Sequence, residues 1–426
     1  MRNHNLFKNI VFVTVIASVL TFAGPAYTQT APKQEKLLNG LKVLMWSDAN
    51  ADKVMVKIRI HAGSAFDPQG KEGVMQLLAD NIFPNAASRE FFAEDLGGNL
   101  EIVTTFDYIQ INASSKPEEF LTMLETLSSA VSNPTIDKET TTKLRNALLA
   151  KVKALESDPA YVADQAAANR LLGTFPYGRP QMGTSESVQR INFPDLIDAK
   201  QRFLSADNAT VAISGNFDRS LGFKAIRRYF GGWLKSDKRV PSTFKQPDLP
   251  PPGVFNVSSP LPDVAAIRFA IRGIARNDKN LVAAMIFTFV LENRLKARIP
   301  ASLTNDVFVH NEARTLPGVI LIGFSGGKNE IGSGNGKIVG SDLVASAISD
   351  AVTEAEFQTA KNAFQTAWSA KDAATIWLDA DTFKTAGADA DAKIAANVTL
   401  NDVRAYAEKL KIQPMVSVLV KSPSDK

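Results

Sequence analysis

The stretch Gly73-Val-Met-Gln-Leu-Leu-Ala-Asp-Asn-Ile-Phe83 has the apolar spacing of a helix, but it carries an amide and a carboxylate among apolar neighbours. Gln76 and Asp80 are four residues apart, so they share one face of the predicted helix. Two histidines at this spacing can hold a zinc ion. Neither residue is a histidine, so the stretch predicts a helix at the position of a metal site without the usual ligands.

The composition bounds what the chain can do. It has 426 residues, of which 45% are hydrophobic and 22% charged, which is typical of a soluble protein with two or more domains. It contains no cysteine, which excludes disulfides, thiol chemistry and cysteine-ligated metals. Its three histidines, His4, His61 and His310, offer little material for a multi-histidine metal site or a histidine-based triad.

The N-terminus has the features of a secretory signal peptide. Arg2 and Lys8 precede the apolar run Ile10–Ala23, and the small residues before position 27 suit signal peptidase. We predict a cleaved signal at residues 1–26 and a periplasmic mature chain, with a retained N-terminal anchor as the alternative. No later segment is long and apolar enough for a membrane span. Cleavage removes two cations and no acids, so the formal charge falls from +4 to +2 and does not favour nucleic acid as a partner.

Moving outward from Gly73, the sequence predicts strands, then helices, then a closing strand. The strands Leu41–Trp46 and Val54–Ile60 are joined by a short polar turn, which predicts a hairpin. Apolar periodicity predicts the remaining main elements of this part of the chain, which are a strand at Ile102–Ala113, helices at Ile136–Leu155 and Tyr161–Leu172, and a strand at Ala209–Ser214.

A charged, proline-bearing segment at residues 234–253 predicts an interdomain linker. Beyond it a similar order of strands and helices recurs, ending in a strand at Met415–Val420. We therefore predict an α+β protein with two tandem homologous domains, residues 37–233 and 254–422. Each domain is expected to be a mostly antiparallel sheet packed with helices.

Several short motifs, taken in order, resemble those of the pitrilysin/insulinase family of zinc metallopeptidases, which includes the mitochondrial processing peptidases. The resemblance covers nearly the whole mature chain and implies that the two domains form a half-clamshell. Its main motifs are Asn39-Gly-Leu-Lys-Val43, Leu96-Gly-Gly-Asn-Leu100, Asp158-Pro159, Pro176-Tyr-Gly-Arg-Pro180 and Tyr229-Phe-Gly-Gly-Trp233.

In active members of this family, the helix that begins near Gly73 carries His-x-x-Glu-His, which supplies two zinc ligands and a general base. This chain has Gln76, Ala79 and Asp80 at those places, and Ala150 or Lys151 at the place of the third ligand. The resemblance therefore implies no catalytic residue, metal or other cofactor on this chain. An alternative is that Gln76 and Asp80 are solvated, or paired with a neighbour such as Lys71, with no function.

The resemblance also implies positions that contact substrate. The family's second domain contributes an arginine and, seven residues later, a tyrosine, which hold the substrate backbone; here Arg298 and Asn305 stand at these places. The alternative for Arg298 is that it is only a solvated cation at the end of a helix, where it faces the negative end of the helix dipole. The strand after Gly97-Gly98 offers its edge to an extended peptide, which would involve Leu100, Glu101 and Ile102.

Bacterial members of the family often work as two different chains, of which only one carries the zinc motif. The resemblance thus implies a non-catalytic, chamber-forming subunit that binds unfolded peptides and pairs with a homologous subunit bearing the zinc. Alone, such a chain is not expected to be an enzyme. The alternative is a structural or peptide-binding scaffold with the same fold, and a third, disfavoured reading is an enzyme active on its own.

Overall fold

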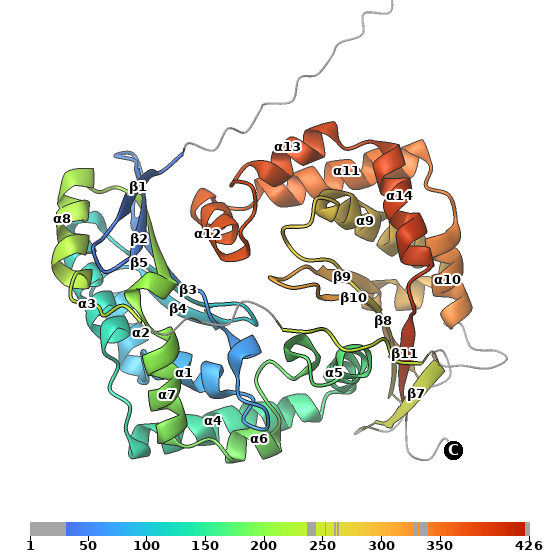
Figure 1. Ribbon diagram of the computed structural model, residues 1–426, viewed down its shortest axis with the longest axis horizontal. Helices are drawn as coiled ribbons and strands as arrows, with labels where there is room; N and C mark the ends of the chain where they lie inside the picture. The colour runs from blue at the N-terminus through green and yellow to red at the C-terminus, as the bar shows by residue number, and fades with distance from the viewer. Residues whose placement is uncertain are drawn as a thin grey trace, which may run out of the picture.

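The computed structural model describes residues 31–236, 244–251, 253–259, 261, 264–327, 331 and 340–421. The predicted signal peptide, residues 1–26, lies outside the described residues. The described chain forms two β-sheets, each flanked by helices, as Figure 1 shows. The prediction of an α+β protein built from two tandem domains is confirmed.

The first sheet and its helices precede residue 231. Its strands are β1 Lys33–Lys36, β2 Lys42–Ser47, β3 Val54–Ile60, β4 Asn99–Thr104, β5 Ile109–Ser115 and β6 Ala209–Gly215. The helices are α1 Val74–Asp80, α2 Ala86–Glu94, α3 Phe120–Ser132, α4 Lys138–Glu156, α5 Pro159–Leu172, α6 Ser185–Gln189, α7 Phe193–Phe203 and α8 Arg219–Phe230.

The second sheet and its helices follow residue 252. Its strands are β7 Gly253–Ser258, β8 Val264–Arg272, β9 Phe308–Glu312, β10 Val319–Gly327 and β11 Val416–Lys421. The helices are α9 Leu281–Arg298, α10 Ser341–Ser349, α11 Glu354–Ser369, α12 Ala373–Phe383, α13 Ala390–Asn397 and α14 Leu400–Lys411.

The two sheets have matching topology. The first runs β1-β2-β6-β3-β5-β4 and the second β7-β11-β8-β10-β9, so β2, β6, β3, β5 and β4 correspond in order to β7, β11, β8, β10 and β9. The strand pairs are antiparallel except β2 with β6 and β7 with β11, which are parallel in both sheets. The predicted repeat of element order is therefore present, and β1 is an addition to the first sheet.

The predicted hairpin between the second and third strands is wrong. β2 and β3 form where expected, but β6 lies between them and pairs with both. Residues 209–213 of β6 are all buried, on both faces of the strand, as expected for a central strand. Alternation within β2 and β3 identified two strands, but it carried no information on which strand would lie between them.

The linker predicted at residues 234–253 is described in part, because residues 237–243 and 252 lie outside the described residues. Its described part packs against the protein. The Phe244 ring lies 6.0 Å from that of Phe66 and 6.5 Å from that of Phe175. Gln246 Nε2 donates to the Pro317 carbonyl at 2.9 Å, so this segment contacts both sheets' domains.

Each domain lends one helix to the other domain's sheet. α5, from the first domain, packs on β8 and β11, and its buried Ala163, Ala167 and Leu171 join an apolar cluster with the second sheet. α12, from the second domain, packs on β6, where Ala374 and Leu378 meet the first sheet. Figure 1 shows α12 beside the first sheet and α5 beside the second. The faces that the domains' own helices leave open are thus covered reciprocally.

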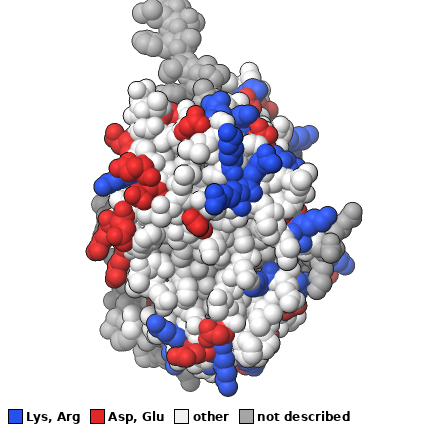
Figure 2. All heavy atoms as spheres, turned by 90° about the vertical axis from the view of Figure 1, so that its left-hand side faces the viewer, with Lys and Arg blue, Asp and Glu red and all other residues white. Residues whose placement is uncertain are grey.

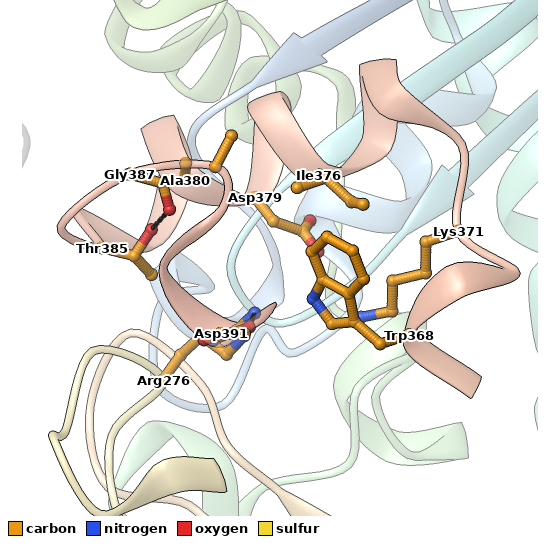
Figure 3. A pocket seen from close by; sticks show the side chains of 10 residues that line it. Arg276, Trp368, Lys371, Ile376, Asp379, Ala380, Thr385, Gly387 and Asp391 are labelled. Atoms are coloured by element: carbon orange, nitrogen blue, oxygen red, sulfur yellow. Dashed lines mark hydrogen bonds and ion pairs between the residues drawn. The ribbon is translucent and has the colours of Figure 1, made fainter. Parts of the chain in front are cut away.

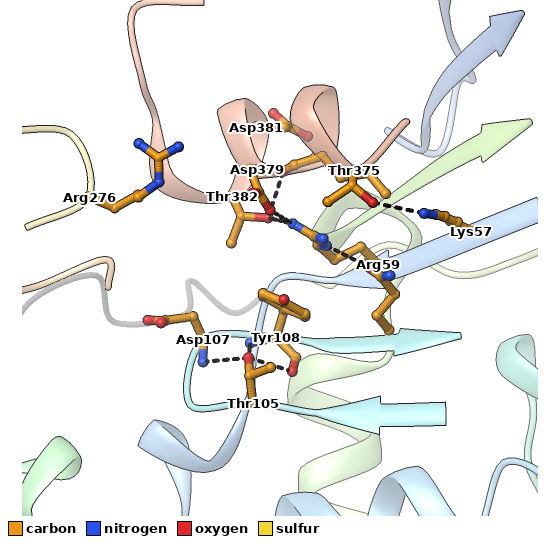
Figure 4. A network of polar contacts seen from close by, with 12 residues as sticks. Lys57, Arg59, Thr105, Asp107, Tyr108, Arg276, Thr375, Asp379, Asp381 and Thr382 are labelled. Carbon is orange, nitrogen blue, oxygen red and sulfur yellow. Dashed lines mark hydrogen bonds and ion pairs between the residues drawn. The ribbon is translucent and has the colours of Figure 1, made fainter. Parts of the chain in front are cut away.

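A buried arginine marks each of these two contacts. The side chain of Arg59 on β3 is 1% exposed and its Nη1 lies 2.7 Å from Asp379 Oδ1 of α12. The side chain of Arg268 on β8 is also 1% exposed, and it is paired with Asp164 of α5. A buried charge needs a partner, so these two ion pairs fix how the domains dock. Figure 4 shows the pair of Arg59 with Asp379.

Further polar contacts surround the Arg59 pair. Lys57 is paired with Asp372, and Lys42 with Asp381, each at 2.7 Å. His61 contacts Thr382 and Thr210, and burial lowers the pKa of its imidazole. The side chains from the first sheet are mainly basic and those from α12 are acidic, so the contact is electrostatically complementary.

Candidate functional site

The backbone at the start of helix α1 packs closely against the backbone of a neighbouring segment. Gly73 has φ of 109° and a Cβ there would lie 2.9 Å from the Met182 carbonyl oxygen, so glycine is required. The buried carboxylate of Asp67 accepts hydrogen bonds from the backbone N–H groups of Gly73 at 2.8 Å and Met75 at 2.7 Å. Burial raises the pKa of Asp67 to about 7, although these bonds oppose the shift. Asp67 thereby fixes the start of the helix on which the site residues lie.

Gln76 and Asp80 form a hydrogen bond with each other. Gln76 Nε2 donates to Asp80 Oδ1 at 3.0 Å, the contact expected for residues four apart on a helix. The alternative pairing with Lys71 is wrong, because Lys71 Nζ lies 2.6 Å from Asp195 Oδ1. Burial raises the pKa of Asp80, and the hydrogen bond from Gln76 and the positive charges of Lys151 and Arg89 oppose this shift.

The residues at the family's zinc positions do not fit zinc. Gln76 offers a neutral amide, Ala79 is fully buried and has no proton acceptor, and Asp80 already holds the Gln76 amide. The ammonium group of Lys151, on α4, acts on Asp80 and would repel a divalent cation there. Among the described residues, no group of three or more histidine, cysteine, aspartate or glutamate side chains is placed to hold a metal ion.

Strand β4 lies beside this helix and forms the end of the first sheet. It pairs with β5, and within the described chain its other edge carries no strand. Leu100 is buried and Ile102 packs against the core, whereas Glu101 faces outward and accepts a hydrogen bond from Asn112 at 3.0 Å. A free edge can pair with an extended peptide through the backbone alone, so these three residues lie where strand addition is possible.

The second-domain candidates lie far from α1. Arg298 ends α9, which Figure 1 places on the other side of the molecule from α1. Its guanidinium donates to Ser346 Oγ at 2.9 Å and is paired with Asp350, both from the α10 region. Asn305 lies in a 3₁₀ helix, Ala301–Asp306, and its side chain is outside the described part of the structure. The structure therefore does not bring Arg298 to the degenerate metal position of the same chain.

Two pockets lie near the domain contact. The pocket in Figure 3, between α12 and the segment that follows it, has about 10 Å³, enough for about one water molecule. A larger cavity of about 210 Å³ lies between α5 and the second sheet. Its lining includes Tyr161 and Asp164 of α5 and His310 and Glu312 of β9. Its size suits a side chain rather than a whole peptide.

Comparison with known proteins gives the family. Residues 42–185 match the sequence profile of the insulinase family, peptidase family M16. Residues 190–364 match the profile of the peptidase M16 inactive domain. The chain belongs to the M16 (insulinase) peptidase family. The resemblance inferred from the sequence motifs is thus confirmed at the level of the family.

Individual M16 relatives match at low identity. An uncharacterized zinc protease of Rickettsia bellii is 22% identical over 208 residues, covering 48% of this chain and 50% of the relative. A probable mitochondrial-processing peptidase subunit beta of Arabidopsis thaliana is 25% identical over 297 residues, covering 66% and 55%. The chain spans about half the length of the curated relatives it matches.

A solved structure supports the M16 fold over nearly the whole chain. The peptidase M16 inactive domain from Pseudomonas fluorescens superimposes with a TM-score of 0.80 at 19% identity, covering 92% of this chain and 98% of that one. This likeness shows the fold. It leaves the roles of Gln76, Ala79, Asp80, Arg298 and Asn305 as predictions.

The paired arginines at the domain contact escaped the sequence reasoning. A signal was present, since Arg268 interrupts an apolar run in β8, and Arg59 and Lys57 alternate with apolar residues in β3. A charged residue at such a position must be exposed or paired. Asp379 is 320 residues from Arg59 along the chain, and Asp164 is 104 residues from Arg268. No local sequence pattern connects either arginine with its partner.

Proposed function

We propose that this M16 chain is the non-catalytic subunit of a two-chain zinc metallopeptidase that acts on unfolded peptides in the periplasm. The observation that carries the proposal is the state of α1. The M16 fold is retained around a helix whose metal positions are filled by a Gln76–Asp80 hydrogen bond and by Ala79. A chain that keeps the enclosure and loses the ligands is suited to assist a partner that supplies zinc and base.

Two features of the chain support a role in substrate binding. The free edge of β4 offers backbone groups to an extended peptide without demanding a particular side chain. Arg298 carries five donors and could hold a substrate carbonyl at the partner's metal if it exchanges its contacts with Ser346 and Asp350. These contacts involve exposed groups, so their exchange is inexpensive.

The periplasmic location rests on the signal-like residues 1–26. Among the residues the structure describes, no helix has the length and apolar character needed to cross a bilayer. The partner of this proposal is a homologous chain bearing His-x-x-Glu-His, and the zinc belongs to that chain.

One observation favours a second candidate. Because Arg298 is already held by Ser346 and Asp350, its guanidinium is engaged within its own domain. This arrangement suits a structural or peptide-binding scaffold that uses the fold without turnover. In that case the β4 edge binds peptide, and no partner peptidase depends on the chain.

Reconstitution separates the two functions. The mature chain is combined with the zinc-bearing M16 homologue of its own host, and cleavage of unfolded peptides is measured for each chain and for the mixture. We expect activity in the mixture that exceeds the sum of the parts. Arg298→Ala should lower kcat/KM about tenfold or more, since a hydrogen bond from a charged group contributes about 1.5–3 kcal/mol.

The matched control is Arg190→Ala, which removes an exposed, ion-paired arginine of the first domain. It should leave cleavage unchanged. Activity of the partner that is indifferent to this chain would reject the subunit role. Peptide binding by the isolated chain, together with that result, would establish the scaffold instead.

A further inference from the structure

One corner of the first domain exposes two leucines side by side in the fold. Leu38, in the turn between β1 and β2, is 108% exposed, and Leu234, just after α8, is 81% exposed. Asn39 holds the two segments together, because its Nδ2 donates to the carbonyl oxygens of Phe230 at 2.8 Å and Trp233 at 2.9 Å. Leu38 and Leu234 are therefore fixed near each other on ordered backbone, and we call this region the α8 corner.

Unpaired cations surround the two leucines. Lys36, Arg227, Arg228 and Lys235 are all exposed, and none has a carboxylate within ion-pair distance among the described residues. Lys224 and Arg219 extend the basic face along α8 in the same state. Figure 2 shows lysine and arginine side chains gathered on the upper part of this face, with most acidic side chains toward one edge and a few beside the basic ones.

The acidic groups near the corner and along α8 are Asp207, Glu35 and Asp218, the exposed N-cap of α8, which accepts a hydrogen bond from the Leu221 backbone N–H at 2.6 Å. Asp207 accepts a hydrogen bond from the Ser236 backbone N–H at 2.8 Å, and Glu35 is paired with Lys33 at 3.0 Å. The corner therefore combines a positive field with two projecting apolar tips. Exposed leucines among cationic side chains suit the surface of a bilayer that contains anionic phospholipid. The leucine side chains can insert into the apolar layer while the lysine and arginine side chains stay at the phosphate groups.

We propose that the α8 corner docks on the surface of a lipid bilayer containing anionic phospholipid. The described residues begin on this side of the molecule, with Ala31 and Pro32 preceding β1. A folded acidic protein would need carboxylates placed to match each cation, whereas a fluid lipid surface adapts to them. The corner is independent of the proposed peptidase role.

Docking at this corner leaves the candidate peptide edge open. β1 and β4 are the two opposite ends of the first sheet, so a membrane at the β1 end does not cover β4. The second domain lies on the far side of the first sheet from α8 (Figure 1). The membrane would thus orient the chain with its peptide-binding edge facing away.

Vesicle sedimentation of the mature chain, residues 27–426, tests this proposal. We expect binding to vesicles of phosphatidylcholine mixed with phosphatidylglycerol, weakening as salt is raised, and no binding to phosphatidylcholine alone. Arg227→Gln with Arg228→Gln should weaken binding roughly thirtyfold, since each cation near an anionic surface contributes about a factor of five. Leu38→Ser with Leu234→Ser should weaken it at least about tenfold.

The control is Ile412→Ser, which alters an isoleucine that is 80% exposed beside Lys409 and Lys411 at the end of α14. It should bind vesicles like the unaltered chain. All the altered side chains are exposed, and circular dichroism checks that each variant is folded. Equal loss in the control, binding that ignores lipid charge, or no binding at all would overturn the assignment. Capture of an acidic protein by this corner, without vesicle binding, would replace the membrane with a protein partner.

Discussion

Asp379→Ala removes the carboxylate that pairs with Arg59 across the domain contact, and it should be strongly destabilising. The Arg59 side chain is 1% exposed and the Asp379 side chain 14% exposed, with Nη1 and Oδ1 2.7 Å apart. After the substitution, Arg59 keeps hydrogen bonds to Gln110 and Thr382, which carry no charge. Two charges about 4 Å apart interact by about 4 kcal/mol at an effective dielectric constant of about 20.

We expect Asp379→Ala to lower the free energy of unfolding by about 3 kcal/mol, near the lower end of the range for buried pairs that lose one partner. The matched control is Asp372→Asn. The Asp372 carboxylate is also 2.7 Å from a lysine of the first sheet, Lys57, but its side chain is 53% exposed, so loss of its charge should cost about 1 kcal/mol or less. Asp372 also caps α12 by accepting a hydrogen bond from the Thr375 backbone N–H at 2.9 Å, and asparagine can retain this cap. Both substitutions remove one negative charge from the α12 region, so the comparison tests the burial of the pair.

The assay is urea unfolding of the mature chain, followed by circular dichroism and tryptophan fluorescence. Trp46 of β2 and Trp377 of α12 lie 6.4 Å apart across the same contact, so fluorescence reports separation of the domains. A double variant, Arg59→Met with Asp379→Leu, should recover most of the loss because no buried charge remains unpaired. If Asp379→Ala costs no more than Asp372→Asn, the buried ion pair does not hold the domains together and the reasoning is refuted.

Three further predictions concern the first domain. Gln76→His, Asp80→His and Lys151→Glu together should create zinc binding measurable by metal analysis, at least about tenfold tighter than in the variant that retains Lys151; equal affinity would contradict the repulsion assigned to this ammonium. In the folded chain Asp67 keeps its proton up to about pH 7, whereas in the unfolded chain it loses the proton near pH 4. The free energy of unfolding should therefore fall as the pH rises between these values. Asp67→Asn should remove this dependence from urea midpoints measured across that pH range. Gly98→Ala places a Cβ 1.8 Å from the Ser114 carbonyl oxygen, so it should cost about 1–3 kcal/mol of stability and weaken peptide binding at β4, whereas an unchanged urea midpoint would show that the strand shifts freely.

The sequence predicted the overall class of the fold because its signals are local. Alternation marked β2 and β3, and apolar periodicity marked the helices α4 and α5. These elements form close to their predicted bounds. The family motifs then supplied the tandem arrangement, which the matching order of the two sheets confirms.

The order of strands and the reciprocal helices were beyond the reach of local patterns. β6 separates β2 from β3 although about 150 residues lie between β3 and β6 in sequence, and its burial on both faces suits the middle of a sheet. Helix α12 places Asp379 and Asp381 against the basic residues Arg59 and Lys42 of the other domain's sheet. Its position depends on charges paired at long range.

The sequence predicted which residues stand at the candidate site, but it did not predict all of their contacts. Counting from Gly73 and from Asp158-Pro159 located Gln76, Ala79, Asp80 and the Ala150/Lys151 position on two helices that do pack together. The sequence left open which of the last two approaches Asp80, and the charge of Lys151 on Asp80 answers this. The engagement of Arg298 by Ser346 and Asp350 required the packing of α9 against α10, which periodicity does not reveal.

The central claim is that this M16 chain serves a partner that carries the zinc. The most direct measurement is gentle purification of the tagged chain from the periplasm of its native host, with mass spectrometry, zinc analysis and a peptidase assay on the same preparation. The account predicts a homologue bearing His-x-x-Glu-His in equal amount, with zinc and peptidase activity in the complex. Recovery of the chain alone, without zinc or activity, or with an unrelated assembly, would contradict it.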